Sequence, residues 1–225
     1  MPLVHEPDVS HADWFARSDA DWRQLCSIGP GGFTAYARVL HPTEPPHGPQ
    51  ELLNAEGDLP DEELRALCEV LASHTSTPGD CFFGLWDGFD LFDPSPVLSV
   101  PQSFPRLELP AALDAALREA PRVRIPARDY LLFRGPLAQA GDWGATEYPP
   151  ELSQLGPHRI NSPNLIWPAD RAWFVATEID LPWTGVGGSA ALVRDLLGAP
   201  ALDVVPARAS PGLPYAREGS PFRPG

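Results

Sequence analysis

The fold of this chain is indicated most clearly by residues 172–181, which read AWFVATEIDL. Successive side chains of a β-strand point to opposite faces of its sheet. One side of this segment would therefore carry Trp173, Val175, Thr177 and Ile179, and the other side Phe174, Ala176, Glu178 and Asp180. We predict a strand at or near the centre of a sheet.

Two amphipathic segments predict helices. In residues 60–73, leucines and a cysteine recur at i, i+3, i+4 and i+7, and three acidic residues occupy the first turn. A second helix is predicted at Ala190–Leu197, with Ser189 as its N-cap and Gly198 as a left-handed C-terminal cap. One or two short helices are expected within residues 13–26.

Further strands are predicted from aromatic and β-branched runs at residues 33–40, 81–86, 107–109, 122–125, 130–133 and 202–205. The pair Asp87-Gly88 suits a tight hairpin turn, so we expect a return strand from Phe89. Residues 110–119 have helical spacing, whereas residues 41–60 and 135–163 are expected to be long, irregular loops.

Together these elements predict one α+β domain over residues 1–206. We expect a mixed or antiparallel sheet, packed by three to four short helices and connected by long Pro-rich loops. Residues 207–225 are rich in proline and glycine and lack apolar periodicity, so they are predicted to form a disordered tail.

Charge and composition disfavour several partner classes. The chain has 30 acidic and 16 basic residues, for a net charge of −14, and such a field repels phosphate backbones and anionic lipid surfaces. We expect neither nucleic acid nor a membrane as partner, whereas a basic protein would suit an acidic surface; the same charge also serves solubility. Every basic residue is an arginine, which excludes lysine Schiff bases and phosphate-loop lysines.

The cysteines and the apolar runs predict a compartment. Cys26, Cys68 and Cys81 are an odd number and lack paired metal-ligand spacing. No secretory apolar region follows the start of the sequence, and the longest apolar runs are far too short to cross a bilayer. We therefore expect a soluble, cytoplasmic protein with reduced thiols.

Glu178 and Asp180 form the pair with the clearest chemical potential. Two residues apart on a strand, their carboxylates would point to one face and could share a proton or a divalent cation, with either one as a general base or metal ligand. Asp170 and Asp87 are the candidates for further ligands. The alternative is a strand with one solvated face, on which carboxylates have no special role.

A second hypothesis concerns tryptophans that lie close in sequence to arginines and carboxylates. Such groups suit a small-molecule cleft or a protein-binding hot spot. The candidate ligand-binding residues are Trp86, Asp87, Arg128, Trp167, Asp170, Arg171 and Trp173. The alternative is that these aromatic rings pack in the core with their polar tips outward.

Two further motifs carry weaker hypotheses. His74 closes the predicted helix at residues 60–73 and precedes Cys81 by seven residues, so a cysteine–histidine dyad oriented by Asp80 can be drawn. A helix-terminal histidine and a core cysteine are the alternative. Residues 185–189 read GVGGS and open a helix, where backbone N–H groups can bind an anion, although a plain turn and N-cap also explains them.

One resemblance covers most of residues 33–205. Residues 164–180 (NLIWPADRAWFVATEID), continuing through residues 184–189, resemble the C-terminal half of a family of uncharacterised proteins from high-GC bacteria. Residues 37–42, 81–88 and 128–136 share that resemblance. It implies an intact fold and, because the family has no assigned activity, no catalytic residue.

We therefore expect a non-catalytic protein-binding domain, of an accessory or immunity type, whose acidic surface engages a basic protein partner. No cofactor and no metal are predicted. The alternative is an enzyme that acts on a small molecule in a cleft lined by tryptophans and by the carboxylates of Glu178 and Asp180.

Overall fold

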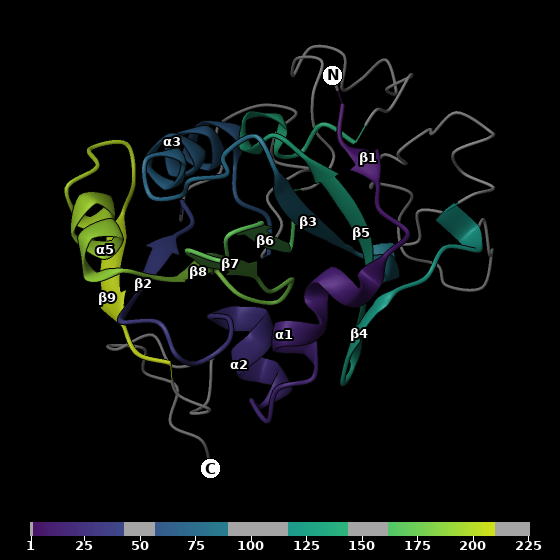
Figure 1. Ribbon diagram of the computed structural model, residues 1–225. Coiled ribbons are helices and arrows are strands. Elements are labelled where there is room, and N and C mark those ends of the chain that lie inside the picture. The colour runs from purple at the N-terminus through teal and green to yellow at the C-terminus, as the bar shows by residue number, and fades with distance from the viewer. Residues whose placement is uncertain (1, 43–56, 90–116, 144–161, 210–225) are drawn as a thin grey trace, which may run out of the picture.

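The computed structural model describes residues 2–42, 57–89, 117–143 and 162–209. Their strands form one nine-stranded antiparallel sheet in the order β1-β5-β3-β6-β7-β8-β2-β9, with β4 also paired to β5 (Figure 1). The strands are β1 (Val4–His5), β2 (Ala35–Leu40), β3 (Cys81–Trp86), β4 (Val123–Ile125), β5 (Arg128–Gly135), β6 (Leu165–Pro168), β7 (Phe174–Thr177), β8 (Trp183–Gly188) and β9 (Val204–Ala207). The expected single α+β domain is confirmed, and its sheet is antiparallel.

β7 lies in the interior of the sheet, between β6 and β8. Val175 pairs with Ile166 of β6 on one edge and with Val186 of β8 on the other. All four residues of the strand are buried. A strand that is covered on both faces and hydrogen-bonded on both edges carries apolar side chains on both sides, so the predicted central position is confirmed.

The β7 strand is shorter than the sequence pattern predicts, because the chain turns directly after Thr177. The amide of Leu181 donates to the carbonyl of Glu178 (3.1 Å), which closes a tight turn before β8. Glu178 and Asp180 therefore belong to the β7–β8 turn. The expectation that they project from one face of a strand is wrong.

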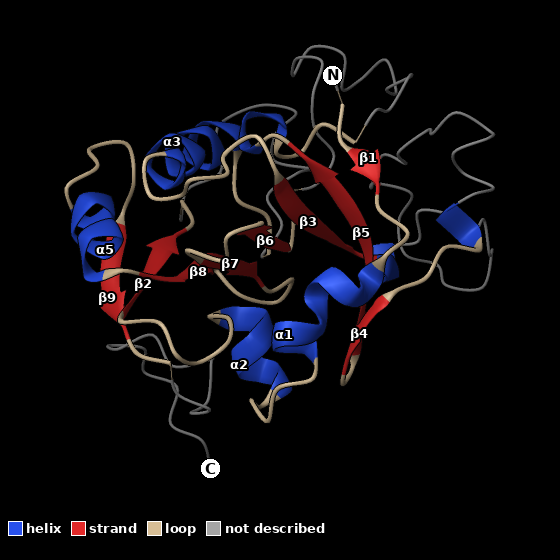
Figure 2. Ribbon diagram, viewed as in Figure 1, coloured by secondary structure: helices blue, strands red, loops and turns tan. Residues whose placement is uncertain are grey.

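Helices cover both faces of the sheet (Figure 2). The residues of β3 alternate between these faces, since Phe83 joins the core beneath α3 and α5 whereas Phe82 joins the core beneath α1 and α2. We call these the α3–α5 face and the α1–α2 face. The helices are α1 (Asp13–Ala16), α2 (Trp22–Ser27), α3 (Asp61–Ala72) and α5 (Ala190–Leu197).

The α3–α5 face is packed by leucines at helical spacing. Leu64, Leu67 and Leu71 of α3 are each at most 4% exposed, and burial of each leucine contributes about 1.5–3 kcal/mol. Trp173 joins the same core and donates its Nε1–H to the carbonyl of Leu71 (3.1 Å). The helix predicted at residues 60–73 is confirmed, with its three acidic residues in the first turn.

The α1–α2 face is built mainly from aromatic rings. Phe15 of α1 meets Trp167 and Phe174 edge to face, with ring centroids 5.0 Å and 4.9 Å apart. Trp167 also stacks on Phe82, with centroids 5.5 Å apart. Such pairs add about 0.5–1.5 kcal/mol each beyond their buried area. One or two helices were expected within residues 13–26, and the structure has two, α1 and α2. Both bury aromatic or apolar side chains.

Residues 185–188 are part of β8, where they pair with β2 and β7, so the predicted turn and the anion-binding loop are wrong. A Cβ on Gly185 would lie 2.2 Å from the carbonyl oxygen of Ser27 and 2.6 Å from Cα of Ile28. The end of α2 therefore packs backbone against backbone on β8. Glycine is present because it allows this close approach.

The predicted caps of α5 are half correct. Ser189 accepts a hydrogen bond from the amide of Leu192 (3.1 Å), as an N-cap does. Gly198 ends the helix with φ of −91°, which is right-handed backbone, so the left-handed cap is wrong. The amide of Gly198 instead bonds the carbonyls of Arg194 and Asp195.

The hairpin predicted at Asp87-Gly88 is also wrong. Residues Asp87–Phe89 form a short 3-10 turn, and β3 is hydrogen-bonded on its two edges to β5 and β6, which leaves no edge for a return strand from Phe89. The tight hairpin turn occurs instead between β4 and β5, where Ile125 pairs with Arg128.

The strands predicted at residues 33–40, 122–125, 130–133 and 202–205 correspond to β2, β4, β5 and β9. The predicted strand at residues 107–109, most of the predicted helix at residues 110–119, residues 43–56 and 144–161 of the predicted loops, and residues 210–225 of the tail lie outside the described residues. No helix in the described part of the chain is long and apolar enough to span a membrane.

Candidate functional site

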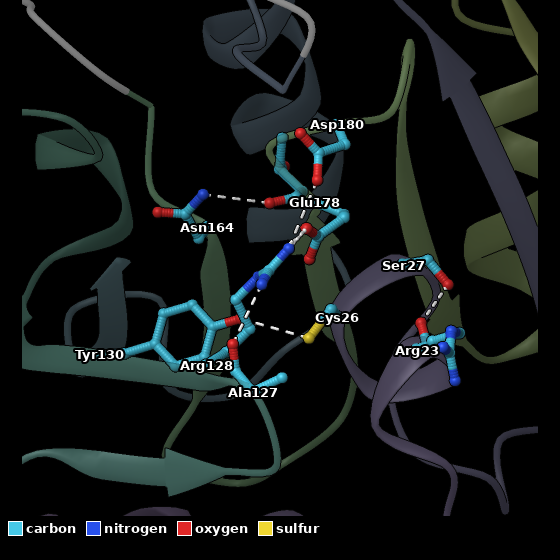
Figure 3. Close-up of polar contacts among 10 residues, drawn as sticks. Arg23, Cys26, Ser27, Ala127, Arg128, Tyr130, Asn164, Glu178 and Asp180 are labelled. Carbon is cyan, nitrogen blue, oxygen red and sulfur yellow. Dashed lines mark hydrogen bonds and ion pairs between the residues drawn. The ribbon is translucent and has the colours of Figure 1, made fainter. Parts of the chain in front are cut away.

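Arg128 is the residue around which the predicted carboxylates assemble (Figure 3). It begins β5 directly after the two-residue turn Pro126-Ala127. Ala127 has φ of 64°, the left-handed backbone that a type II turn requires at its second central position. Nη1 of Arg128 donates to the carbonyl of Ala127 (3.0 Å), so the turn fixes where the arginine side chain starts.

The guanidinium of Arg128 binds the two carboxylates of the β7–β8 turn. Nε donates to Oε1 of Glu178 (3.1 Å), and Nη2 donates to the same oxygen and to Oδ2 of Asp180 (3.4 Å). The Glu178 side chain is 8% exposed, that of Arg128 is 15% exposed and that of Asp180 is 59% exposed. Arg128 and Glu178 thus form a buried ion pair, with Asp180 as its solvated outer partner.

The ion pair keeps Arg128 charged. Burial lowers the pKa of Arg128, but the hydrogen bonds and the charge of Glu178 outweigh burial and raise the pKa overall. An opposite charge at this distance favours the ionised form of the guanidinium.

Two tryptophans flank the guanidinium of Arg128. Its Cζ lies 5.5 Å from the ring centroid of Trp22 on α2 and 5.5 Å from that of Trp86 at the end of β3. Cation–π contacts of this kind contribute about 0.5–2 kcal/mol, depending on their exposure. The arginine therefore joins four segments: the β4–β5 turn, the β7–β8 turn, α2 and β3.

Similar stacking recurs on the same side of the sheet. Arg23 lies 4.6 Å from the ring centroid of Trp22, and Arg171 lies 5.4 Å from that of Trp14 on α1. All three tryptophans are partly exposed, and Arg23 and Arg171 are exposed. The set that we call the arginine–tryptophan surface consists of Trp14, Trp22, Trp86, Arg23, Arg128 and Arg171.

A thiol and a phenol lie next to the ion pair (Figure 3). The hydroxyl of Tyr130 donates to Sγ of Cys26 (3.4 Å). Burial raises the pKa of Cys26 to about 12, with a further upward contribution from the charge of Glu178. Burial also raises the pKa of Tyr130 well above its usual range. Both groups are neutral at neutral pH, and a neutral thiol is neither a nucleophile nor a metal ligand.

Asn164 fixes the ends of the strands that frame the site. Its Oδ1 accepts from the amide of Trp86 (2.8 Å), and its Nδ2 donates to the carbonyl of Thr177 (3.1 Å). This side chain is 2% exposed. It therefore holds the end of β3 next to the end of β7, from which Trp86 and Glu178 reach Arg128.

The predicted carboxylate pair is thus brought together, but by a guanidinium. The positive charge of Arg128 replaces the shared proton or divalent cation that the sequence hypothesis places between Glu178 and Asp180. Among the described residues, no group of three histidine, cysteine or acidic side chains could hold a metal ion.

The two further candidate carboxylates are engaged elsewhere. Oδ2 of Asp87 pairs with Nε of Arg122 (2.9 Å). Asp170 accepts from the hydroxyl of Thr75 (2.8 Å) and from the amide and the hydroxyl of Ser76 (2.7 Å each). Burial raises the pKa of Asp170, but these hydrogen bonds outweigh it and lower the pKa overall. Asp170 therefore ties the β6–β7 turn to the loop after α3.

The predicted tryptophan cleft does not form. Trp167 is 1% exposed and belongs to the core of the α1–α2 face, whereas Trp173 is fully buried in the core of the α3–α5 face. Two rings on opposite faces of a sheet cannot line one cleft. Of the predicted ligand-binding residues, Trp86, Arg128 and Arg171 remain on the arginine–tryptophan surface.

The predicted cysteine–histidine dyad does not form either. Nε2 of His74 bonds Oδ2 of Asp195 (2.9 Å), and Asp80 accepts from Nε and Nη2 of Arg134 (2.6 Å and 2.8 Å). Cys81 is fully buried, and burial raises its pKa to about 12. The three side chains therefore do not act together. His74 is a helix-terminal histidine and Cys81 is a core cysteine, as the alternative hypothesis predicts.

The residues that sequence reasoning missed are Trp14, Trp22, Arg23, Cys26 and Asn164. They occur in the sequence without a motif, and Cys26 is 104 residues from its partner Tyr130. The one local signal is that Trp22 precedes Arg23 in the sequence. This signal does not indicate that Arg128 also lies over the Trp22 ring.

Comparison of the chain with protein-family models, with curated proteins and with solved structures finds no match. The resemblance to a family of uncharacterised proteins from high-GC bacteria therefore stays a prediction, and the site has to be interpreted from its own geometry.

Proposed function

We propose that this chain is a non-catalytic protein-binding domain, of an accessory or immunity type, that meets a protein partner through the arginine–tryptophan surface. The observation that carries the proposal is that three partly exposed tryptophans on one side of the sheet each have an arginine beside the ring. Tryptophan and arginine are the side chains most enriched among the residues that dominate protein–protein binding energy.

The electrostatics of the site favour binding over catalysis. A general base must be free to take a proton from a substrate, whereas the buried carboxylate of Glu178 receives two hydrogen bonds from Arg128. Cys26 holds its proton, with a pKa of about 12. We also retain the cytoplasm as the proposed compartment, in which the three buried cysteines stay reduced, and we propose no nucleic acid partner for a chain of charge −14.

The test is native mass spectrometry of the affinity-tagged chain, purified gently from its own host. We expect a stoichiometric protein partner. In the double variant Arg23→Ala/Arg171→Ala, binding of that partner should weaken by about tenfold or more, since hot-spot residues contribute about 1–2 kcal/mol or more each. Both arginines are exposed, so the fold should be unaffected.

The matched control is Arg65→Ala/Arg124→Ala, which removes the same charge from two exposed arginines outside this surface. Equal retention of the partner by both double variants would show that the surface is the wrong one. A retained metal or small molecule that disappears in Glu178→Gln, with the circular dichroism spectrum unchanged, would replace the proposal with the enzyme alternative.

A further inference from the structure

Residues of α3, of α5 and of the segment after α5 line a groove. These two helices cover the α3–α5 face of the sheet, opposite the α1–α2 face (Figure 1). The volume of the groove is about 470 Å³, within the range of about 300–1,000 Å³ that is typical of ligand pockets. Ala66 and Val70 of α3 form one apolar wall, and Pro200 and its neighbouring alanines form the other. These walls suit a hydrocarbon chain more than a hydrated ion.

Negative charge lines the rim of this groove. Glu69 of α3 is exposed, and the side chain of Asp195 on α5 is 53% exposed. No arginine is among the described residues that line the groove. His74 is the hydrogen-bond partner of Asp195 (2.9 Å), and an imidazole can make this bond without carrying a charge.

The ends of the two helices add to the negative potential. α3 ends at Ala72 and α5 ends at Leu197. The groove is lined by residues 73–74, after α3, and by residues 199–201, after α5. The C-terminus of a helix carries about half a negative charge, which favours a cation within the last turn. Two helix dipoles and two carboxylates therefore converge on one groove.

We propose that this groove docks an arginine or lysine side chain of a basic protein partner. The aliphatic stem of such a side chain packs against Ala66, Val70 and Pro200, and its cationic head meets Glu69 and Asp195. The groove is separate from the arginine–tryptophan surface, so this proposal does not depend on that surface.

The experiment uses two fluorescein-labelled peptides of alternating alanine and arginine, or of alanine and citrulline, the uncharged analogue of arginine. Fluorescence anisotropy is measured with the full chain at physiological ionic strength, where the Debye length is about 8 Å and distant charges are screened. We expect saturable binding of the arginine peptide and about tenfold weaker binding of the citrulline peptide.

Three variants locate the binding site. Glu69→Gln/Asp195→Asn should weaken binding of the arginine peptide by about tenfold, because each exposed charge pair contributes up to about fivefold. Ala66→Leu fills the groove at constant charge and should weaken binding by several-fold. Glu119→Gln/Asp129→Asn removes two exposed charges that do not line the groove and should change binding by less than twofold.

The proposal is overturned if the arginine peptide shows no saturable binding, if both charge-removing pairs weaken it equally, or if Ala66→Leu leaves it unchanged. Equal weakening would mean attraction by the overall charge of the protein. Arg23→Ala/Arg171→Ala should leave the peptide affinity unchanged, so failure of the groove and failure of the arginine–tryptophan surface give different results.

Discussion

The two faces of the sheet are stabilised in different ways. On the α3–α5 face, Leu64, Leu67 and Leu71 pack against apolar residues of the strands, and each contact is between neutral groups. On the α1–α2 face, aromatic rings surround a buried ion pair between Arg128 and Glu178. The first core is a sum of many similar contacts, whereas the second depends on one charged side chain that four segments share.

This difference determines how each face responds to substitution. A lost methyl group in an apolar core costs transfer free energy plus a cavity. Loss of one partner of a buried ion pair leaves a charge in a low-dielectric environment and costs more than the pair contributes when both partners are present. The α1–α2 face should therefore show strong coupling between sites, and the α3–α5 face should not.

The largest expected effect comes from removal of the guanidinium. Arg128→Met should lower the free energy of unfolding by about 3–5 kcal/mol, because Glu178 is left buried and unpaired. Glu178→Met in addition should restore a large part of the loss, since two apolar side chains need no counter-charge. Urea denaturation of the single and double variants measures both values.

Leu67→Ala on the other face supplies the comparison, with an expected loss of about 2–5 kcal/mol. In the double variant Leu67→Ala/Arg128→Met, the loss in free energy of unfolding should be close to the sum of the two single losses, since the two residues lie on opposite faces of the sheet. If Glu178→Met fails to rescue Arg128→Met, the ion pair is not what holds the α1–α2 face together.

The second effect compares two glycines of β8 that face opposite helices. A Cβ on Gly185 would meet backbone atoms of Ser27 and Ile28 at 2.2 Å and 2.6 Å, whereas a Cβ on Gly188 would meet the flexible Cδ2 of Leu192 at 2.6 Å. Gly185→Ala should therefore cost about 3 kcal/mol or more and Gly188→Ala about 1 kcal/mol. Thermal unfolding of the two variants checks the ranking, and equal losses would contradict the backbone contact of α2.

The sequence predicts the elements whose signal is local. The leucine spacing of α3 and the alternation in β7 are repeated over neighbouring residues, and both are confirmed. The boundary of β7 was missed because the turn that holds Glu178 and Asp180 contains neither glycine nor proline at its centre. Conversely, the glycines of β8 resemble a turn in the sequence, but Gly185 is required by the close approach of Ser27, which is distant in sequence.

The candidate site was predicted only in part for the same reason. Alternation brought Glu178 and Asp180 to attention, but their partner Arg128 is 50 residues from Glu178, and no local pattern indicates such a pairing. Trp167 and Trp173 lie six residues apart in sequence but on opposite faces of the sheet. Trp167 packs with Phe174 on the α1–α2 face, and Trp173, which directly precedes Phe174, points to the other face. Proximity in the sequence was therefore misleading for the tryptophans.

The third effect is pH-dependent and concerns the α3–α5 face. His41 is 8% exposed and bonds Oγ1 of Thr184 through Nε2 (2.9 Å), and burial lowers its pKa to about 4. The unfolded chain, with a histidine pKa of about 6.5, binds more protons between these two values, so stability falls as the pH decreases from about 6.5 towards 4. From pH 7 to pH 5 the loss should be about 2 kcal/mol.

Urea denaturation at the two pH values measures this loss, and His41→Asn should remove most of it. The pKa of His5 is also lowered, mainly by burial. His5→Asn is therefore the matched control, and it should remove a smaller part of the stability loss between pH 7 and pH 5. An unchanged pH dependence in His41→Asn would exclude His41 as the group that titrates.

The smallest effect distinguishes the ends of two helices, one on each face. Gly29, after α2, has φ of 91°, and a Cβ there would lie 2.5 Å from the ring of Phe174. Gly198, after α5, has φ of −91°, and a Cβ there would meet only carbonyl oxygens at 3.6 Å. Gly29→Ala should therefore destabilise the protein by more than about 1 kcal/mol.

Gly198→Ala should instead stabilise the protein by about 0.4–1 kcal/mol, because alanine fits this backbone and restricts the unfolded chain. The left-handed cap predicted from the sequence requires the opposite sign, since alanine is strained at positive φ. Thermal unfolding of the variant thus decides between the two geometries by the sign of the change. A stabilised Gly198→Ala variant beside a destabilised Gly29→Ala variant would show that the two helices end differently although a glycine follows each.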